Sequence, residues 1–426
     1  MKSTAQKQSP PETELPKQVK KVLKPKVPIK AASKVNPLTL ALKAIDKSTK
    51  GAVKRIELSK APLPCVSTGS IAIDNLIGGN PSADGTGPVC MGFPRGHISE
   101  VYGPEASGKT TLALEAIVEI QKQGGTALFL DYEHALHHGY ATKLGIRFDD
   151  SFAHLQPDDM EQGMETLRIA ALAGVDLIVV DSVAAMVPKS DMEKKFTEGD
   201  QIGSRARALA SLLPKIVKVL HQPSKHNNKR AAVIFINQTR ANISTGPGGG
   251  GSGDNTSGGK ALKFFAYLRL MVTRIGSEYL EVKDSLSREK RRVPFGNKTL
   301  VKVIKSKVDA KQGHSCNIFI RYGQGIDDYY TMIESGVAHK VVKKSGAYYE
   351  FEGQNIQGRE KFRRFLMSDP KSFQRLRAGV LKAIRAQATD VDLEEDDADV
   401  DDLLTSAEIG ELEETPEEEL VESSDG

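Results

Sequence analysis

Residues 103–110 read Gly-Pro-Glu-Ala-Ser-Gly-Lys-Thr, and together with their neighbours they constrain the fold more than any other feature of the chain. The apolar stretch 97–102 precedes them and predicts a strand, whereas 109–123 follows with helical periodicity and stops at two glycines. Glycines at this spacing let backbone N–H groups surround phosphate oxygens at a helix N-terminus. Lys109 can reach the β- and γ-phosphates and the Thr110 hydroxyl can bind Mg²⁺, so the sequence predicts a nucleoside triphosphate site.

Three polar side chains end or follow predicted strands, where an α/β sheet assembles its site. Asp181 closes a continuous apolar run and is placed to hold Mg²⁺ or its water, although an ordinary strand-ending Asp is the alternative. Glu133 can orient the attacking water in hydrolysis, whereas a solvated loop Glu fits its position equally well. Gln238 can sense the γ-phosphate without ionising, or it can be a structural amide.

Charge is distributed unevenly along the chain. Lys and Arg number 59 against 55 Asp and Glu, and 18 of the acidic residues lie in 390–426, which has no Lys or Arg. The remainder therefore carries a net charge of +22, which indicates a polyanionic partner. The acidic tail is either a solubility device or a competitor of nucleic acid for the basic surface.

The amino-acid composition bears on solvation, on membrane association and on the redox state of the compartment. The hydrophobic share of 39% is low and predicts long solvated segments. No apolar run approaches the roughly 20 residues that a membrane span needs, so we expect no membrane partner. Three widely spaced cysteines without a C-x-x-C motif fit a reducing cytoplasm.

Strand and helix patterns alternate through the middle of the chain, which predicts an α/β fold with a mostly parallel sheet flanked by helices. The helical stretch 206–220 contains Pro214, which is expected to kink or split it. Expected strands are 126–130, 175–180, 231–236, 268–272, 300–304 and 317–322. The expected divisions are a disordered basic extension (1–36), an N-terminal helical arm (37–63), a core with the nucleotide site (64–328), a small basic α+β domain (329–388) and a disordered acidic tail (389–426). The family resemblance described next implies that the arm serves oligomerisation and that the core is an ATPase.

Several ordered motifs together resemble the RecA family of DNA-strand-exchange recombinases. The resemblance covers about 38–385 and implies a RecA-like P-loop ATPase core. The motifs are GPEASGKTT (103–111), DYEHAL (131–136), VVDSVAA (179–185), FINQTR (235–240), GGKALKF (258–264), KVIKSK (302–307), RYGQGI (321–326) and KSGAYY (344–349).

The resemblance implies roles for individual residues. Glu133 is the expected catalytic carboxylate, and Gln238 is expected to couple the state of ATP to the DNA-binding loop that follows it. Lys305 and Lys307 are expected to reach the γ-phosphate of a neighbouring subunit, although a solvated strand face would explain them on composition alone. The nucleotide residues implied are Gly103, Pro104, Glu105, Ala106, Ser107, Gly108, Lys109, Thr110, Thr111, Tyr140 and Tyr322, with Thr110 and Asp181 on the metal.

Two loops are expected to hold DNA. The first covers about 194–203, and the second, about 239–259, contains a glycine-rich run that no core could use. Basic side chains around them supply charge for phosphates. The implied DNA-binding residues are Ile202, Gly203, Arg207, Arg240, Ile243, Gly258, Gly259, Lys260 and Lys263.

The sequence departs from the family pattern at a few places. The second loop has no aromatic residue, and His137 stands where an acidic residue commonly precedes the adenine tyrosine, Tyr140. The implied function is nevertheless that of an ATP-dependent recombinase using ATP and Mg²⁺, which forms a homo-oligomeric helical filament on single-stranded DNA and pairs it with duplex DNA. Single-strand-binding and loader proteins are further expected partners.

Two alternatives use the same ATPase core. A ring-forming helicase usually needs a separate N-terminal collar, for which residues 1–60 are too short and polar. An ATP-switched filament scaffold that activates the self-cleavage of a partner remains compatible with the residues as an additional role.

Overall fold

The computed structural model of the protein divides the chain into two units, Met1–Lys60 and Ala61–Gly426. It describes residues 41, 45, 47, 48, 63–78, 90–194, 203–239, 256–283, 290–308 and 312–394. In the first unit all four described residues are helical, and the Ser48 hydroxyl donates to the carbonyl of Ile45 at 3.1 Å. All four lie in 37–63, the stretch where a helical arm was expected.

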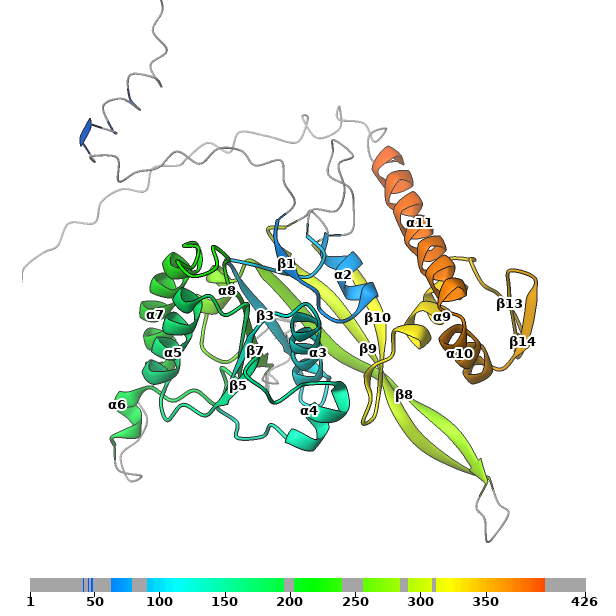
Figure 1. Ribbon diagram of the computed structural model, residues 1–426, viewed down its shortest axis with the longest axis horizontal. Helices are drawn as coiled ribbons and strands as arrows, with labels where there is room; N and C mark the ends of the chain where they lie inside the picture. The colour runs from blue at the N-terminus through cyan, green and yellow to red at the C-terminus, as the bar shows by residue number, and fades with distance from the viewer. Residues whose placement is uncertain are drawn as a thin grey trace, which may run out of the picture. The chain divides into compact units, whose positions relative to one another are not determined.

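A nine-stranded sheet organises the second unit (Figure 1). The strands from β8 to β5 in the order below run parallel to one another, whereas β9, β10 and β11 are added through antiparallel pairing. The predicted fold class is therefore confirmed. In spatial order the strands are β11 (Gly325–Ile326), β10 (Ser315–Arg321), β9 (Lys290–Ser306), β8 (Leu268–Lys283), β3 (Ile98–Gly103), β7 (Ala232–Gln238), β6 (Leu177–Asp181), β4 (Ala127–Asp131) and β5 (Phe152–Leu155).

The central strands are continuous apolar runs because both faces of the sheet are covered. Val179 of β6 packs in one cluster with residues of α3 (Lys109–Lys122), whereas its neighbours Ile178 and Val180 pack on the other face with α5 (Met160–Ala173) and α7 (Ser204–Leu220). Helix α7 is one continuous helix of 17 residues with Pro214 inside it, so the expected split is wrong. The other helices of this part are α2 (Ile71–Gly78), α4 (His138–Leu144), α6 (Lys189–Met192) and α8 (Ala261–Phe265), and a separate pair of short strands is β1 (Cys65–Val66) and β2 (Phe93–Pro94).

A buried ion pair joins the strands in the middle of the sheet. Arg269 Nε of β8 lies 2.5 Å from Glu100 Oε2 of β3, and Glu100 is fully buried. Asn237 of β7 donates through Nδ2 to Glu100 Oε1 at 2.9 Å and to the carbonyl of Ser257 at 3.0 Å. Three neighbouring strands and the segment that leads into α8 are therefore held by one carboxylate.

A small α+β part follows the sheet and has a core of its own, which includes Phe362, Leu366 and Leu376. The three-stranded sheet in it is antiparallel in the order β12-β13-β14. Its elements are α9 (Asp328–Ala338), β12 (Lys343–Ser345), β13 (Tyr348–Phe351), β14 (Gln354–Gln357), α10 (Arg359–Ser368) and α11 (Pro370–Glu394).

The carboxyl group of Asp328 fastens this part to the core. Asp328, the first residue of α9, accepts hydrogen bonds from the Ser70 hydroxyl and the Ile71 N–H, both at 3.2 Å, at the start of α2. Burial raises the pKa of Asp328 to about 7 in spite of these bonds, and the charge of the nearby Asp74 acts in the same direction. The folded protein therefore holds a proton on Asp328 that an unfolded chain releases at lower pH.

We expect this proton to make stability depend on pH. The carboxyl ionises near pH 4 when the chain is unfolded and near pH 7 when it is folded, so the free energy of unfolding falls as the pH rises between these values. Asp328→Asn keeps the hydrogen-bond acceptor and should flatten the dependence by about 1–2 kcal/mol between pH 5 and 7, measured by urea denaturation. Asp150→Asn, at an exposed position, is the control. Parallel curves for Asp328→Asn and the parent chain would contradict the assignment.

Candidate functional site

The phosphate loop lies between β3 and α3, as the sequence predicts. Gly108 has a φ of +98° and Ala106 a φ of +54°, so the backbone turns sharply before the helix begins. At Gly103 a side chain is excluded, because a Cβ would lie 2.0 Å from the carbonyl oxygen of Val272 on β8. The loop is thus packed directly against the neighbouring strand, and its N–H groups sit at the N-terminus of α3.

Lys109 is buried at the first position of α3, and its Nζ donates to the carbonyl of Pro104 at 2.6 Å. Burial lowers the pKa of Lys109, and the carboxylates of Asp181 and Glu133 oppose this shift. The cation therefore lies across the loop, close to the positions that phosphate oxygens take in such loops.

Thr110 and Asp181, which were predicted to hold the metal, are in direct contact. The Thr110 hydroxyl donates to Asp181 Oδ2 at 2.7 Å across the gap between α3 and the end of β6. Burial raises the pKa of Asp181 to about 7, and the nearby Glu133 and Asp131 contribute in the same direction. A hydroxyl beside one carboxylate suits Mg²⁺, which prefers oxygen ligands and completes its shell with phosphate oxygens and water. No group of three or more His, Cys, Asp or Glu able to hold a metal occurs within the described ranges.

Glu133 lies at the meeting point of three strand ends. Its Oε1 accepts hydrogen bonds from Gln238 Nε2, at 2.9 Å, and from the Ser182 hydroxyl. Glu133 follows β4, Ser182 follows β6 and Gln238 ends β7, so parallel strands bring them to one edge. The structure thus joins the two predicted residues, and it adds Ser182, whose only signal in the sequence was its position directly after Asp181.

Tyr140 and Tyr322 both line a cavity of about 500 Å³ in front of the phosphate loop. The Tyr140 hydroxyl is 3.0 Å from Thr111 Oγ1, and the Tyr322 hydroxyl donates to Asn297 Oδ1 at 2.6 Å. The sequence reasoning missed Arg274, Asn297 and Arg321, because they reach the cavity from strands far along the chain. The lining residues are Ala106, Ser107, Gly108, Lys109, Thr110, Thr111, Tyr140, Arg274, Asn297, Ile320, Arg321, Tyr322 and Gly323.

Lys305 and Lys307 do not join this cluster. Lys305 Nζ donates to the carbonyls of Lys263 and Phe264, at 2.7 and 2.9 Å, at the end of α8. Lys307 N–H bonds the carbonyl of Tyr267, whose own N–H bonds Ile98 at the beginning of β3. The phosphate loop starts at the other end of β3, roughly 17 Å away at strand spacing. A lysine side chain is much shorter than this distance.

The described ends of the two predicted DNA loops lie close together. Gly203 precedes α7 and Gly259 precedes α8, and both glycines have positive φ. A Cβ at Gly259 would lie 2.9 Å from Cβ of Ala206 in α7, and one at Gly258 would lie 2.6 Å from Leu209. A bridge between Thr239 and Thr256 closes the second loop at its base. Arg207, Lys260 and Lys263 belong to these helix starts, whereas Ile202, Arg240 and Ile243 lie outside the described residues.

Comparisons with known proteins match almost the whole described chain. The pattern of the RecA N-terminal domain matches residues 36–327, and that of the RecA C-terminal domain matches 331–385. The chain belongs to the RecA family. Relatives named Protein RecA include those of Kineococcus radiotolerans (41% identical over 343 residues, 80% of this chain and 89% of that protein) and Mycolicibacterium smegmatis (38% over 371 residues, 85% and 97%). The protein of Nocardia farcinica is 40% identical over 336 residues, 78% of this chain and 87% of its own length.

Membership in the RecA family confirms the expected function class. This RecA-family chain is a DNA-dependent ATPase of recombination and repair that uses ATP with Mg²⁺, binds DNA and forms homo-oligomeric filaments. Among the described residues, no helix has both the length and the apolar character to cross a membrane.

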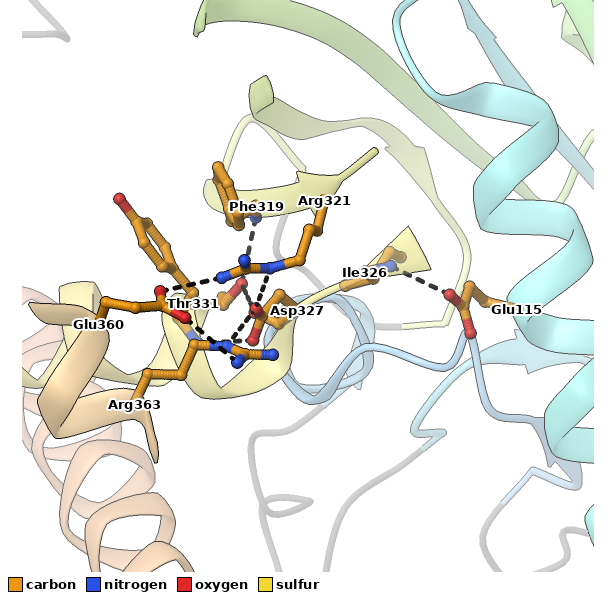
Figure 2. A network of polar contacts seen from close by, with 9 residues as sticks. Glu115, Phe319, Arg321, Ile326, Asp327, Thr331, Glu360 and Arg363 are labelled. Atoms are coloured by element: carbon orange, nitrogen blue, oxygen red, sulfur yellow. Dashed lines mark hydrogen bonds and ion pairs between the residues drawn. The ribbon is translucent and has the colours of Figure 1, made fainter. Parts of the chain in front are cut away.

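A charged network connects the wall of the cavity to the C-terminal part (Figure 2). Arg321, next to Tyr322, lies 3.1 Å from Asp327 Oδ2 through Nε and 3.1 Å from Glu360 through an Nη. Arg363 of α10 shares Asp327 at 2.5 Å. Ile326, beside Asp327, donates its N–H to Glu115 of α3 at 3.0 Å. In this RecA-family chain, residues 321–327 therefore link three parts of the structure: helix α3, the cavity wall at Tyr322, and helix α10.

We expect Arg321→Ala to destabilise the fold and to weaken nucleotide binding together. It removes a buried charge from Asp327, although Arg363 still compensates that carboxylate, so we expect a loss of about 3 kcal/mol. Because Arg321 and Tyr322 are consecutive in the cavity wall, the affinity for a fluorescent ATP analogue should fall as well.

Urea denaturation and analogue titration measure the two effects. Arg321→Lys should recover part of both, and Arg364→Ala, at an exposed position of α10, should change neither. Normal affinity in a destabilised Arg321→Ala protein would mean that the network does not shape the cavity.

Proposed function

We propose that this RecA-family chain performs strand exchange with ATP held between successive protomers of the filament. This proposal is supported mainly by the distance along β3 that separates the phosphate loop from the two lysines, Lys305 and Lys307. The two lysines lie at the N-terminal side of the parallel sheet, and the loop lies at its C-terminal edge. A head-to-tail contact between identical protomers brings such opposite surfaces together and generates an open helix when it does not close.

Catalysis at this seam uses residues of two protomers. Glu133 orients the attacking water, and the hydrogen bonds from Ser182 and Gln238 hold its carboxylate in place. Lys109 binds the phosphates, and Thr110 with Asp181 holds Mg²⁺, which neutralises developing charge when it is bound. Lys305 and Lys307 of the adjacent protomer complete the site, and the base lies between Tyr140 and Tyr322. Phe264, which is 71% exposed beside the Lys305 contact, offers that adjacent surface an apolar side chain.

Gln238 connects the γ-phosphate to DNA. It ends β7, and the second loop begins at the next residue and returns at Thr256. Asn237, directly before it, is bonded to the carbonyl of Ser257, so both ends of that loop are anchored beside Gln238. A change in the contact between Gln238 and Glu133 is therefore transmitted to the loop over one residue.

The DNA-binding residues proposed are those of the two loops and of the starts of α7 and α8. They contact the backbone of single-stranded DNA and leave the base edges free, so that Watson–Crick pairing with a duplex reads the sequence, as pairing does in RNA-guided systems. Single-strand-binding and loader proteins are proposed as further partners. The domain division given above and a cytoplasmic location, which suits three free cysteines, complete the proposal.

The outer strand β5 has an edge and an apolar surface to which we assign the N-terminal arm. Within the described part of the chain β5 pairs only with β4, so its other edge can accept a strand or an arm. A cavity of about 360 Å³ lies between β5 and α5, and Leu155 and Ile169 beside it are 45% and 56% exposed. We propose that the arm of the adjacent protomer covers this apolar surface.

Glu133→Gln tests the catalytic assignment. The amide keeps the size of the side chain but lacks the charge that polarises water, so DNA-stimulated hydrolysis should fall by about 10²-fold or more. Binding of ATP and of single-stranded DNA should persist, as measured by phosphate release and by fluorescence anisotropy. Glu350→Gln, at an exposed position of β13 outside the nucleotide site, is the control. A Glu133→Gln protein that hydrolyses ATP at the parental rate would require another group to orient the water.

Mixing two inactive proteins tests the shared site. Lys305→Ala protomers keep an intact phosphate loop, and Lys109→Ala protomers keep Lys305. If the lysine acts across the seam, an equal mixture should regain hydrolysis at about a quarter of its seams, because that share pairs an intact loop with an intact lysine. Lys361→Ala, exposed on α10, should be active alone. A mixture as inactive as its components would refute the shared site.

A further inference from the structure

The β8–β9 hairpin extends well beyond the sheet that it belongs to (Figure 1). Strand β8 contacts β3 only through Leu268–Met271, and β10 supports β9 only up to Gly296. Beyond Glu278, which pairs with Gly296, the two strands have no third strand beside them in the described residues. We call the paired residues 279–283 and 290–294 the ribbon.

The ribbon points past the nucleotide edge of the protein. Strand β8 runs parallel to β3, which ends at the phosphate loop, and Met271 lies beside Tyr102. The twelve residues from Met271 to Lys283 correspond to roughly 40 Å of strand. On the way Arg274 and Asn297 line the nucleotide cavity. Anything that stacks on the nucleotide edge therefore has the ribbon along its side.

Apolar side chains are exposed on the ribbon and just before it. Ile275, Tyr279, Leu280 and Val293 are 48%, 46%, 38% and 40% exposed, and Leu280 pairs directly with Val293 across the strands. An isolated two-stranded ribbon is marginally stable in water, and a cluster of exposed apolar residues marks a contact surface. Leu280 and Val293 share one face of the ribbon and are therefore suited to packing against a protein, whereas Tyr279, directly before Leu280, faces the other side.

The base of the ribbon is fixed to the C-terminal part. Arg359 bonds Glu278 at 2.9 Å and Glu334 at 2.8 Å, and its guanidinium lies 4.1 Å from the centre of the Tyr330 ring. This anchoring holds the ribbon in one direction, so a partner does not need to order its base on binding.

The position of the ribbon, and not its charge, indicates which partner lies along it. Glu281 pairs with Lys290 at 3.1 Å, and Glu278 at the base is neutralised by Arg359. Arg292 lies over the ring of Tyr279, 4.9 Å from its centre. Ion pairing and stacking engage Lys290 and Arg292, but the ribbon as a whole carries four basic residues (283, 290, 291 and 292) against one acidic residue (281), so the crosslinking below includes DNA among its outcomes. The neighbour that stacks on the nucleotide edge is another copy of this chain.

We propose that the ribbon is a clasp between successive protomers, with Leu280 and Val293, which share one face, packed on the flank of the next copy. This inference rests on the head-to-tail arrangement proposed above. It assigns a second, ATP-independent contact to the same interface, on a segment outside the nucleotide site.

Photo-crosslinking identifies the partner of the clasp. A photoreactive phenylalanine analogue at position 280 in the full chain is irradiated with single-stranded DNA and a slowly hydrolysed ATP analogue, and the products are analysed by mass spectrometry. The expected product joins two copies of the chain. A product that joins the chain to DNA, or no product between copies, would overturn the proposal.

Leu280→Thr with Val293→Thr tests the energy of the contact while keeping strand-forming side chains. The double variant should need roughly tenfold more protein for half-maximal filament assembly, followed by light scattering, because two aliphatic contacts are lost. Binding of the ATP analogue and the circular dichroism spectrum should stay unchanged. Glu281→Gln with Lys290→Gln is the matched control, since it alters only the ion pair, and should assemble at nearly the parental concentration.

The results of these experiments distinguish the clasp from the shared nucleotide site. If the lysine and phosphate-loop mutants complement one another but the double threonine variant assembles normally, the clasp is refuted and the shared site stands. If the same variant loses DNA affinity with unchanged assembly in the absence of DNA, the ribbon contacts DNA and the clasp is refuted. If complementation fails, the head-to-tail seam itself is wrong.

Discussion

The carboxylate of Glu100 holds together the part of the sheet on which the site depends. It is fully buried, yet it is compensated by Arg269 on one side and Asn237 on the other. A buried charge that lost either partner would remain largely uncompensated, so this arrangement tolerates little displacement of the three strands. Gly103 begins the phosphate loop three residues after Glu100, and Gln238 directly follows Asn237. The ion pair therefore fixes the spacing between the phosphate loop and the residue that precedes the second DNA loop.

The chemistry at the edge of the sheet follows from that fixed spacing. Parallel strands end side by side, so Asp181, Glu133 and Gln238 converge although they are far apart in sequence. Burial acts in opposite directions on the two charged groups nearest the phosphates, raising the pKa of Asp181 and lowering that of Lys109. A magnesium nucleotide places negative phosphate beside the lysine and a cation beside the carboxylate, and so stabilises the charged form of each.

The common direction of the parallel strands determines which surfaces of two protomers can meet in the filament. Nucleotide residues lie at one end of the parallel strands, and Lys305 with Lys307 lies at the other, which suits a head-to-tail helix. Strands β8 and β9 give this direction a physical extension, since they continue far past the nucleotide edge while Arg359 anchors them at their base. The same C-terminal part reaches the cavity wall through Arg321 and Asp327, so its position and the shape of the cavity are connected.

Features that depend on consecutive residues could be predicted from the sequence. The glycines and Lys109 of the phosphate loop, the apolar run before Asp181 and the alternation of strands and helices each carry their own signal, and they predicted the fold class and most of the nucleotide edge. The lengths of the strands were harder to predict from the sequence. Residues 273–299 are polar and lack the alternation of a half-buried strand, so the long hairpin was not predicted. Pro214 was expected to kink or split its helix, yet it lies within one continuous helix.

The remaining features depend on residues that meet only when the chain is folded. Ser182 beside Glu133, Asn297 beside Tyr322 and Arg321 between Asp327 and Glu360 have partners 49, 25, 6 and 39 residues away, and no local pattern encodes those distances. By itself the sequence determined that the chain binds a nucleoside triphosphate at the end of a strand, because a phosphate loop is a continuous segment. The tertiary structure alone decided which lysines lie too far away to reach that triphosphate, since separation across a sheet is set by strand register and not by position in the chain.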